Sequence, residues 1–162
     1  MRYRGPLYRA LNPGWVRDPL SGEGARRFGG RFNPRGTPAL YTSTTIMAAV
    51  REANQIGTLQ PTTLVSYETD IAPIFDAEDA AALASFVMTP EMIAANDWRT
   101  RMTRDGIAPS QEFARRLIAA GHAGMRVRSF ARGAGPEDIN IVLWAWDAEC
   151  LALNDHEGRL RR

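Results

Sequence analysis

Five short segments of the chain carry the apolar pattern of β-strands. Residues 6–10, 39–42, 63–69 and 125–129 are short apolar or alternating stretches, and residues 139–146 are apolar almost throughout. A continuously apolar strand is typical of a position inside a sheet, where both of its faces are covered. We therefore expect at least five strands, with 139–146 in the interior of the sheet.

A helix is predicted directly after the second of these strands. Ser43 or Thr44 caps its start, and Gly57 stops it after about Ile56. Glu52 lies to the side of the predicted buried stripe, at the border between core and solvent. Four apolar residues at helical spacing define that stripe: Ile46, Ala49, Val50 and Ala53.

Two further regions are predicted to be helical. Residues 76–97 are rich in alanine and acidic residues, and Pro90 is expected to divide them into two pieces. A later helix begins at Ser110 and ends at Gly121. Together with the strands, these helices predict an α+β fold in which residues 1–162 form a single domain.

The segment between the first two strands, residues 11–38, has little periodicity. It holds six glycines and four prolines together with Trp15, Phe28 and Phe32. A loop of this length inside a compact domain is usually functional or disordered. Because its aromatic and arginine content is unlike that of a spacer, we interpret it as a binding loop.

Charge is distributed along the chain in blocks. Lysine is absent, so all twenty Lys+Arg residues are arginines. Residues 1–51 hold nine arginines against two acids, residues 52–97 hold eight acids and no arginine, and residues 98–135 return to an arginine excess. Such an excess suits a phosphate-bearing ligand, because a guanidinium binds phosphate through two N–H donors. Nucleic acid is a competing partner, but the aromatic residues do not interleave with the arginines as a stacking platform requires.

The cysteine count, the hydropathy and the positions of the histidines indicate which kinds of protein this chain is not expected to be. The single cysteine, Cys150, cannot close an internal disulfide. No apolar stretch is long enough to cross a bilayer and no secretory signal is visible, so we expect a cytoplasmic protein without membrane contact. His122 and His156 lack neighbouring cysteines or paired carboxylates, and no metal site is predicted.

Three residues near the N-terminus form a candidate site. Arg31 follows the glycine pair Gly29-Gly30, where the backbone can approach a ligand closely and the guanidinium can bind a pyrophosphate. Tyr41, on a predicted strand, offers an aromatic face to a flat heterocycle. The Glu52 carboxylate can bind a ribose hydroxyl and stabilise the positive charge that develops as a glycosidic bond breaks. Each residue also has an ordinary explanation: a turn, a packed tyrosine, or a helix-surface glutamate paired with a residue such as Arg51.

Several sequence blocks are shared with a known family. The specific part extends from Gly24 to Glu52 and contains Gly29-Gly30-Arg31-Phe32-Asn33 and Leu40-Tyr41-Thr42-Ser43. Weaker blocks are Leu7-Tyr8-Arg9-Ala10, Ser129 at the end of a predicted strand, and Asn140-Ile141-Val142-Leu143-Trp144. Over about residues 6–146, these blocks resemble the RES domain, a family named for an arginine, a glutamate and a serine.

The resemblance implies a fold, an activity and a partner. RES proteins have an ADP-ribosyltransferase-like mixed β core with flanking helices, and they are toxins of type II toxin–antitoxin modules. Their substrate is NAD, no metal is expected, and the ADP-ribose passes to a protein, to water or to phosphate. The partner is an antitoxin with an Xre-like helix-turn-helix region. The family arginine, glutamate and serine correspond to Arg31, Glu52 and Ser129; Tyr41 corresponds to a tyrosine beside the nicotinamide, Arg9 to a second arginine near the phosphates, and Asn140 is expected at the ligand.

Three classes of function are therefore to be compared. The first is an enzyme that breaks NAD at the nicotinamide–ribose bond. The second is a module that binds NAD or ADP-ribose without turnover, which would use Arg31 and Tyr41 but has no need of Glu52. The third is an arginine-rich nucleic-acid-binding protein, whose binding would depend strongly on salt.

Overall fold

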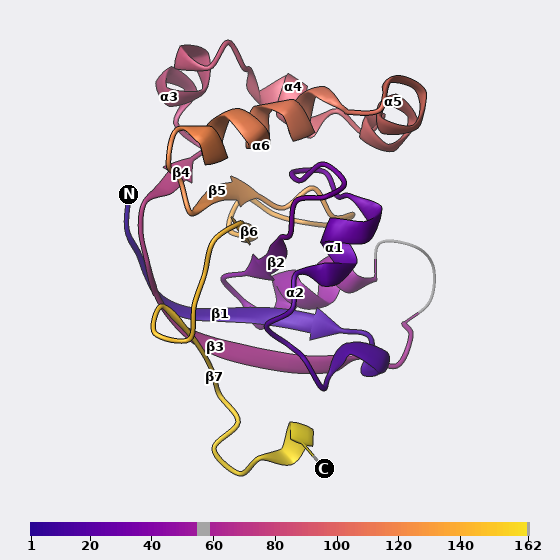
Figure 1. Ribbon diagram of the computed structural model, residues 1–162, viewed down its shortest axis with the longest axis vertical. Coiled ribbons are helices and arrows are strands. Elements are labelled where there is room, and N and C mark those ends of the chain that lie inside the picture. The colour runs from indigo at the N-terminus through magenta and orange to yellow at the C-terminus, as the bar shows by residue number, and fades with distance from the viewer. Residues whose placement is uncertain (55–58, 162) are drawn as a thin grey trace.

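The structure, a computed structural model, describes residues 1–54 and 59–161, which form a mixed sheet with helices packed on it (Figure 1). This arrangement confirms the predicted α+β class. Its strands are β1 (Tyr3–Leu11), β2 (Leu40–Ser43), β3 (Thr63–Ile71), β4 (Ile74–Asp76), β5 (Gly124–Arg128), β6 (Ile139–Leu143) and β7 (Leu151–Leu153). Its α-helices are α1 (Glu23–Phe28), α2 (Ile46–Ala53), α3 (Ala80–Ser85), α4 (Pro90–Ala94), α5 (Trp98–Asp105) and α6 (Pro109–Ala119), and short 3-10 helices lie at Pro13–Trp15 and Arg159–Arg161.

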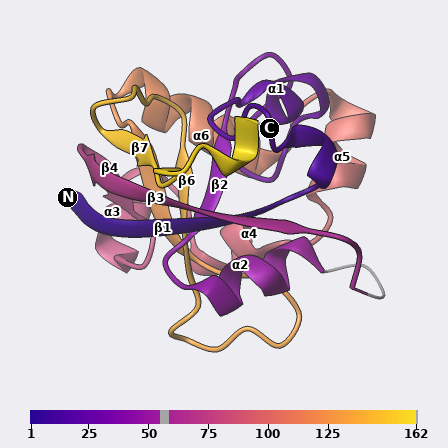
Figure 2. The same cartoon turned by 90° about the horizontal axis from the view of Figure 1, so that it is seen from below.

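The strands of the sheet form two groups that run in different directions. The strand order is β4-β5-β6-β2-β1-β3-β7, and every neighbouring pair is antiparallel except β4 and β5. β2 pairs with β6 over all of its residues but meets β1 at a single registered pair, Tyr8 opposite Ser43. Figure 2 shows β2 and β6 running across the direction of β1 and β3. The residues near this junction therefore come from strands of both groups.

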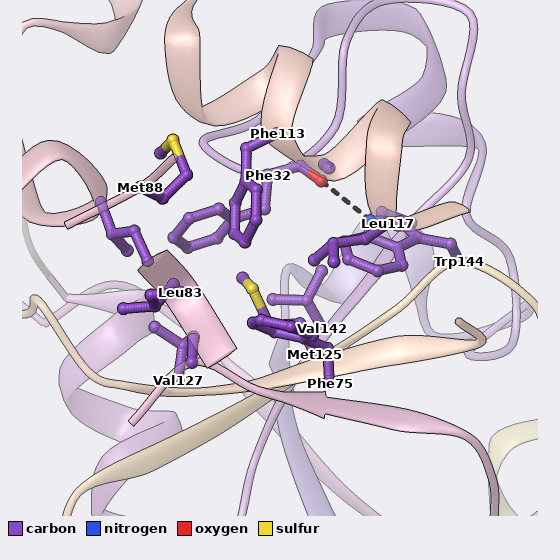
Figure 3. Close-up of a cluster of buried hydrophobic side chains, with 14 residues drawn as sticks. Phe32, Phe75, Leu83, Met88, Phe113, Leu117, Met125, Val127, Val142 and Trp144 are labelled. Atoms are coloured by element: carbon purple, nitrogen blue, oxygen red, sulfur yellow. Dashed lines mark hydrogen bonds between the residues drawn. The ribbon is translucent and has the colours of Figure 1, made fainter. Parts of the chain in front are cut away.

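One apolar cluster lies between β4–β6 and helices α3, α4 and α6 (Figure 3). Phe75 of β4 packs edge-on against Phe113 of α6 and against Phe86, with ring centroids 5.7 and 5.4 Å apart. Phe32, from the predicted binding loop, joins the same cluster, and its carbonyl oxygen accepts a hydrogen bond from Trp144 Nε1 at 2.8 Å. The loop is therefore anchored in the core at this residue.

A second apolar cluster lies along β1, β3 and their neighbours. Leu7 and Tyr67 are both fully buried in it, on paired positions of β1 and β3. The Tyr67 hydroxyl donates to the Pro19 carbonyl oxygen at 2.6 Å. This bond attaches the first part of the segment 11–38 to the strand β3.

Some predicted boundaries need correction. Residues 11–38 are not an irregular loop throughout, because they contain α1 and a 3-10 helix. The strand predicted at 139–146 ends at Leu143, although its interior position is confirmed. Residues 76–97 do form two helical pieces, with Pro90 as the first residue of the second. Several elements were not predicted, among them β4, β7 and α5. The two strands have three residues each, and α5 shows no broad apolar stripe because only Trp98 and Met102 in it are apolar.

The buried face of the helix α2 overlaps only in part with the predicted stripe, because Ala49 is buried as predicted but Ile46 and Ala53 are exposed. The N-cap of the helix is Thr45, and Ala48 and Ala49 are its buried residues, whereas Ile46 is 49% exposed. Small side chains let the helix lie close to β1 and β2, so they contribute the contact surface although their apolar signal is weak. Glu52 follows Ala48 by four residues and is partly buried where α2 meets the pocket, which confirms its predicted place at the border of the core. The predicted last turn and Gly57 lie outside the described residues. Within the described ranges, no helix is long and apolar enough to span a membrane.

The cap of α2 gives a testable prediction. The Thr45 hydroxyl accepts a hydrogen bond from the Ala48 N–H at 3.1 Å. We expect Thr45→Ala to lower the free energy of unfolding by about 1 kcal/mol, and Thr45→Ser to keep most of the wild-type stability. Chemical denaturation of both variants measures the difference. An equal loss in the two variants would show that the cap hydroxyl does not stabilise α2.

Candidate active site

A pocket of about 390 Å³ opens where β1, β2 and β6 adjoin α2 and the start of α5. This volume falls in the range of small-molecule sites, roughly 300–1,000 Å³. Ser129 does not line the pocket but contacts a residue that does. The residues proposed from the sequence that line it are Arg9, Arg31, Tyr41, Glu52 and Asn140. The pocket thus brings together residues that are more than a hundred positions apart in the sequence.

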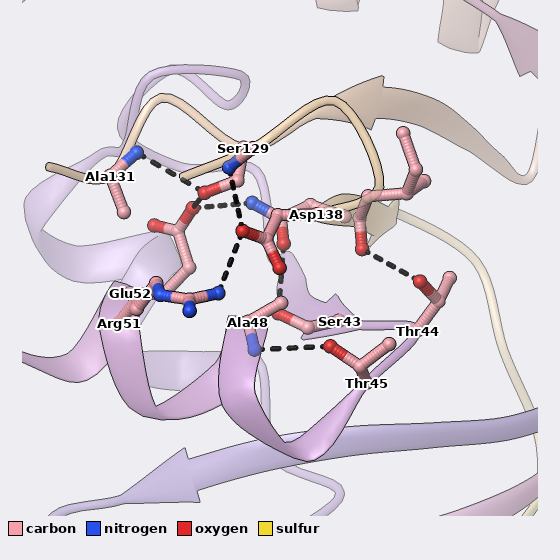
Figure 4. A network of polar contacts seen from close by, with 12 residues as sticks. Ser43, Thr44, Thr45, Ala48, Arg51, Glu52, Ser129, Ala131 and Asp138 are labelled. Atoms are coloured by element: carbon pink, nitrogen blue, oxygen red, sulfur yellow. Dashed lines mark hydrogen bonds and ion pairs between the residues drawn. The ribbon is translucent and has the colours of Figure 1, made fainter. Parts of the chain in front are cut away.

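The Glu52 carboxylate is held by donors from two later segments (Figure 4). Ser129 Oγ, directly after β5, donates a short hydrogen bond to Glu52 Oε1. Asn140 Nδ2, on β6, donates to the same oxygen at 2.6 Å. The Ser129 oxygen accepts in turn from the Ala131 N–H at 3.1 Å. Hydrogen bonds to an ionised acceptor are short and strong, so this arrangement fixes the orientation of the carboxylate.

Ser43 and Glu52 together fix the direction of the Asn140 amide. The Ser43 hydroxyl, on β2, donates to Asn140 Oδ1 at 2.8 Å, and the serine is 2% exposed. The amide nitrogen therefore faces Glu52. A reversed amide would turn its oxygen toward the carboxylate, and two acceptors cannot hydrogen-bond to each other. The register of β2 against β6, with Ser43 opposite Asn140, thus contributes to the position of Glu52.

The loop between β5 and β6 is attached to α2 beside Glu52. Asp138, 2% exposed, pairs with Arg51 at 2.7 Å and accepts from the Gly135 N–H at 2.8 Å. The Asp138 carbonyl oxygen accepts from the Ser129 N–H at 2.7 Å. In Figure 2 this loop passes beside α2. The ion pair therefore holds Ser129 near Glu52, and it places the Arg51 guanidinium on Asp138.

The Arg31 guanidinium is held by neutral oxygens. It donates to the carbonyl oxygens of Ala95 at 2.8 Å and Ile93 at 3.3 Å and to Asn96 Oδ1 at 3.2 Å. It also lies over the ring of Phe130, 4.8 Å from the centroid. Burial lowers the pKa of Arg31, and the nearby Glu52 charge opposes that shift. An arginine stays protonated in proteins, so neutral acceptors fix this side chain without cancelling its charge.

Tyr41 connects the glycine pair to the strand β2. Its hydroxyl donates to Asn33 Oδ1 at 2.6 Å and accepts from the Phe32 N–H at 3.0 Å. Burial raises the pKa of Tyr41, so the phenol is neutral at physiological pH. Gly30 is needed for this contact, because a Cβ there would lie 2.3 Å from the tyrosine oxygen. The half-buried ring lines the pocket while the hydroxyl holds the Arg31 loop.

The pocket wall carries an excess of positive charge. Most arginines of the chain pair with carboxylates, but Arg9, Arg31 and Arg99 form no ion pair within the described ranges. Arg9 donates to the Pro19 carbonyl oxygen at 3.3 Å. Glu52 is the acidic residue among those that line the pocket, as far as the chain is described. A ligand that suits this wall carries negative charge over much of its length.

Sequence reasoning missed several residues of this site, among them Ser43, Arg99 and Phe130. Ser43 was interpreted as a helix cap although it ends a strand. Arg99 belongs to the arginine-rich block 98–135, which was the one available signal. Phe130 contacts Arg31 only because the segment after β5 turns toward it, which no local pattern reveals. In residues 1–54 and 59–161, no group of His, Cys, Asp or Glu is arranged to hold a metal ion.

Comparison with known proteins identifies the family. The family model described as the RES domain matches residues 6–162. The chain belongs to the RES domain family. The crystal structure of the M. tuberculosis MbcT–MbcA toxin–antitoxin complex contains a chain with a similar fold, at a TM-score of 0.71 and 22% sequence identity. The match covers 96% of this chain and 84% of the solved one. No curated protein matches the sequence.

In this RES domain, the arginine, glutamate and serine that the sequence blocks pointed to converge on one region. Ser129 contacts Glu52 directly, and the charge of Glu52 acts on Arg31. Tyr41 and Asn140 line the same pocket. The oriented carboxylate of Glu52 and the fixed guanidinium of Arg31 therefore line the same pocket.

The close contact at Gly30 yields a prediction about the loop. We expect Gly30→Ala to lower the free energy of unfolding by about 1–3 kcal/mol, because the new methyl group would overlap the Tyr41 hydroxyl. Gly24→Ala is the matched control: Gly24 lies within α1, and a Cβ there would meet no atom closer than 3.9 Å. We expect the free energy of unfolding of that variant to rise by up to about 1 kcal/mol, because alanine favours a helix more than glycine does. Thermal unfolding compares them, and equal stability of the two variants would contradict the packing described for Tyr41.

Proposed function

We propose that this RES domain is the toxin of a toxin–antitoxin module and cleaves NAD at the nicotinamide–ribose bond. The observation that carries the proposal is a pocket with one oriented carboxylate and with arginines that have no ion-pair partner in residues 1–54 and 59–161. NAD has a matching distribution of charge. Its pyrophosphate is negative, and positive charge grows on the nicotinamide ribose as the glycosidic bond breaks.

The chemistry needs little more than electrostatics. The bond between ribose C1′ and the nicotinamide nitrogen breaks, its electron pair leaves with the nicotinamide, and the ribose becomes oxocarbenium-like. A carboxylate beside that ribose stabilises the transition state more than the bound substrate. The acceptor oxygen or nitrogen then bonds to C1′ and loses its proton. The acceptor is a protein side chain, water or phosphate, and the mass of the product distinguishes them.

We assign the residues of the pocket to distinct tasks. Arg31 and Arg9 bind the pyrophosphate, because a guanidinium offers paired donors to phosphate oxygens. The Tyr41 ring packs against the nicotinamide, since its hydroxyl is engaged with Asn33 and Phe32. Glu52 stabilises the reacting ribose. Ser129 and Asn140, expected at the ligand from the family resemblance, act chiefly by orienting Glu52.

Family membership supports the role as a toxin. RES domains resemble ADP-ribosyltransferase toxins and consume NAD, and the solved complex with a similar fold pairs a toxin with an antitoxin. We infer that this chain acts in the cytoplasm and arrests growth, either by depleting NAD or by modifying a protein. Its partner is then an antitoxin with an Xre-like helix-turn-helix region.

The reaction is tested at Glu52. Glu52→Gln keeps an oxygen that can accept from Ser129 and Asn140 but removes the charge. We expect single-turnover release of nicotinamide to fall by roughly a hundred- to a thousandfold while NAD affinity changes little. Glu112→Gln, an exposed site on α6, is the control and should react at the wild-type rate. Near-normal release by Glu52→Gln would leave a protein that binds the nucleotide without cleaving it.

The toxin role has its own test in cells. We expect expression of the wild-type chain alone to arrest growth, because NAD is consumed or a protein is modified. Cells that express Glu52→Gln at the same soluble level should grow, and co-expression of the neighbouring antitoxin should rescue the wild type. Arrest that persists undiminished with Glu52→Gln would mean that toxicity does not come from this chemistry.

A further inference from the structure

The start of α5 carries a guanidinium that no step above uses. Arg99 lines the pocket, and its guanidinium lies over the ring of Trp98, 4.4 Å from the ring centroid. Trp98 is 8% exposed, so its ring is a fixed support. Stacking orients the plane of a guanidinium while its N–H donors, which lie in that plane, stay available for an acceptor.

Arg99 differs in this respect from the other arginines of the same helix. Arg101 pairs with Asp97 at 3.3 Å, and Arg104 pairs with Asp105 at 2.8 Å. Arg99 has neither an ion pair nor a hydrogen bond within residues 1–54 and 59–161. Its charge is therefore directed to the pocket without a protein partner to neutralise it.

The segment before α5 also connects Arg99 to Arg31. The carbonyl oxygens that hold Arg31 belong to Ile93 and Ala95, a few residues before Trp98. After burial, which is the main cause, the charge of Arg99 also lowers the pKa of Arg31. Two like charges that face one pocket repel each other, and an anion placed between them removes this cost.

We propose that Arg99 joins Arg31 and Arg9 at the pyrophosphate, forming with Arg31 a clamp for the two linked phosphate groups, and that Arg99 is a specificity residue for the dinucleotide. The proposal depends on the proposed function only in naming the ligand. Arg31 binds from the loop after α1, and Arg99 binds from the start of α5. The segment 93–99 positions both arginines, because its carbonyl oxygens hold Arg31 and its buried tryptophan supports Arg99.

The test measures binding without turnover. ADP-ribose is titrated calorimetrically into the wild type, Arg99→Gln and Arg101→Gln at low and at high salt, and inorganic pyrophosphate is titrated as a competitor. We expect Arg99→Gln to weaken ADP-ribose binding roughly tenfold, about 1.4 kcal/mol, and to reduce the effect of salt. Pyrophosphate should lose potency as a competitor by a similar factor. Arg101→Gln, whose arginine is already ion-paired and does not line this pocket, should bind both probes like the wild type.

Several results would overturn the clamp. Unchanged affinity of Arg99→Gln for both probes would remove Arg99 from the phosphate site, and so would an equal loss in Arg101→Gln. Weaker ADP-ribose binding with unchanged pyrophosphate competition and unchanged salt dependence would mean that Arg99 shapes the pocket without contacting phosphate. A wild type that binds both probes but does not cleave NAD would contradict the proposed function and leave the clamp intact.

Discussion

The structure around the pocket depends on one contact, the pair of hydrogen bonds from Ser129 and Asn140 to a single oxygen of Glu52. A carboxylate that leaves bulk water needs donors to replace its hydration. Here the donors come from the end of β5 and from β6, and Glu52 comes from α2. The ion pair between Arg51 and Asp138 fastens the same segments one residue away along the helix. The site is therefore assembled only when the helix, the sheet and the β5–β6 loop are all in place.

The positively charged Arg31 guanidinium is held in a different way. Arg31 is fixed by two carbonyl oxygens, an amide oxygen and the ring of Phe130, none of which carries a negative charge. A salt bridge would have fixed the side chain equally well but would have compensated its charge. Neutral acceptors keep the field of the guanidinium directed at the pocket, as a site requires if it binds phosphate with groups oriented in advance. Tyr41 and Gly30 complete this arrangement by fixing the backbone from which Arg31 projects.

The sequence allowed good prediction of the elements with a clear period and of the residues shared with the family. The strands β2, β3 and β6 and the helix α6 were expected close to where they lie. The predicted buried face of α2 was correct at Ala49 but wrong at its first turn, because the buried Ala48 carries a weaker apolar signal than the exposed Ile46. Ser43 and Arg99 were missed as site residues for a related reason. The role of each is set by a partner distant in sequence or by a neighbouring ring, and neither feature leaves a local pattern.

The central claim is that an oriented carboxylate, together with arginines that have no ion-pair partner among the described residues, makes this RES domain an enzyme that breaks NAD. It is tested most directly by mass spectrometry of the products after the purified wild-type chain is incubated with NAD in cell lysate. The account predicts free nicotinamide together with ADP-ribose that is joined to water, to phosphate or to a protein. NAD that stays intact, with a folded chain that still binds ADP-ribose, would contradict it.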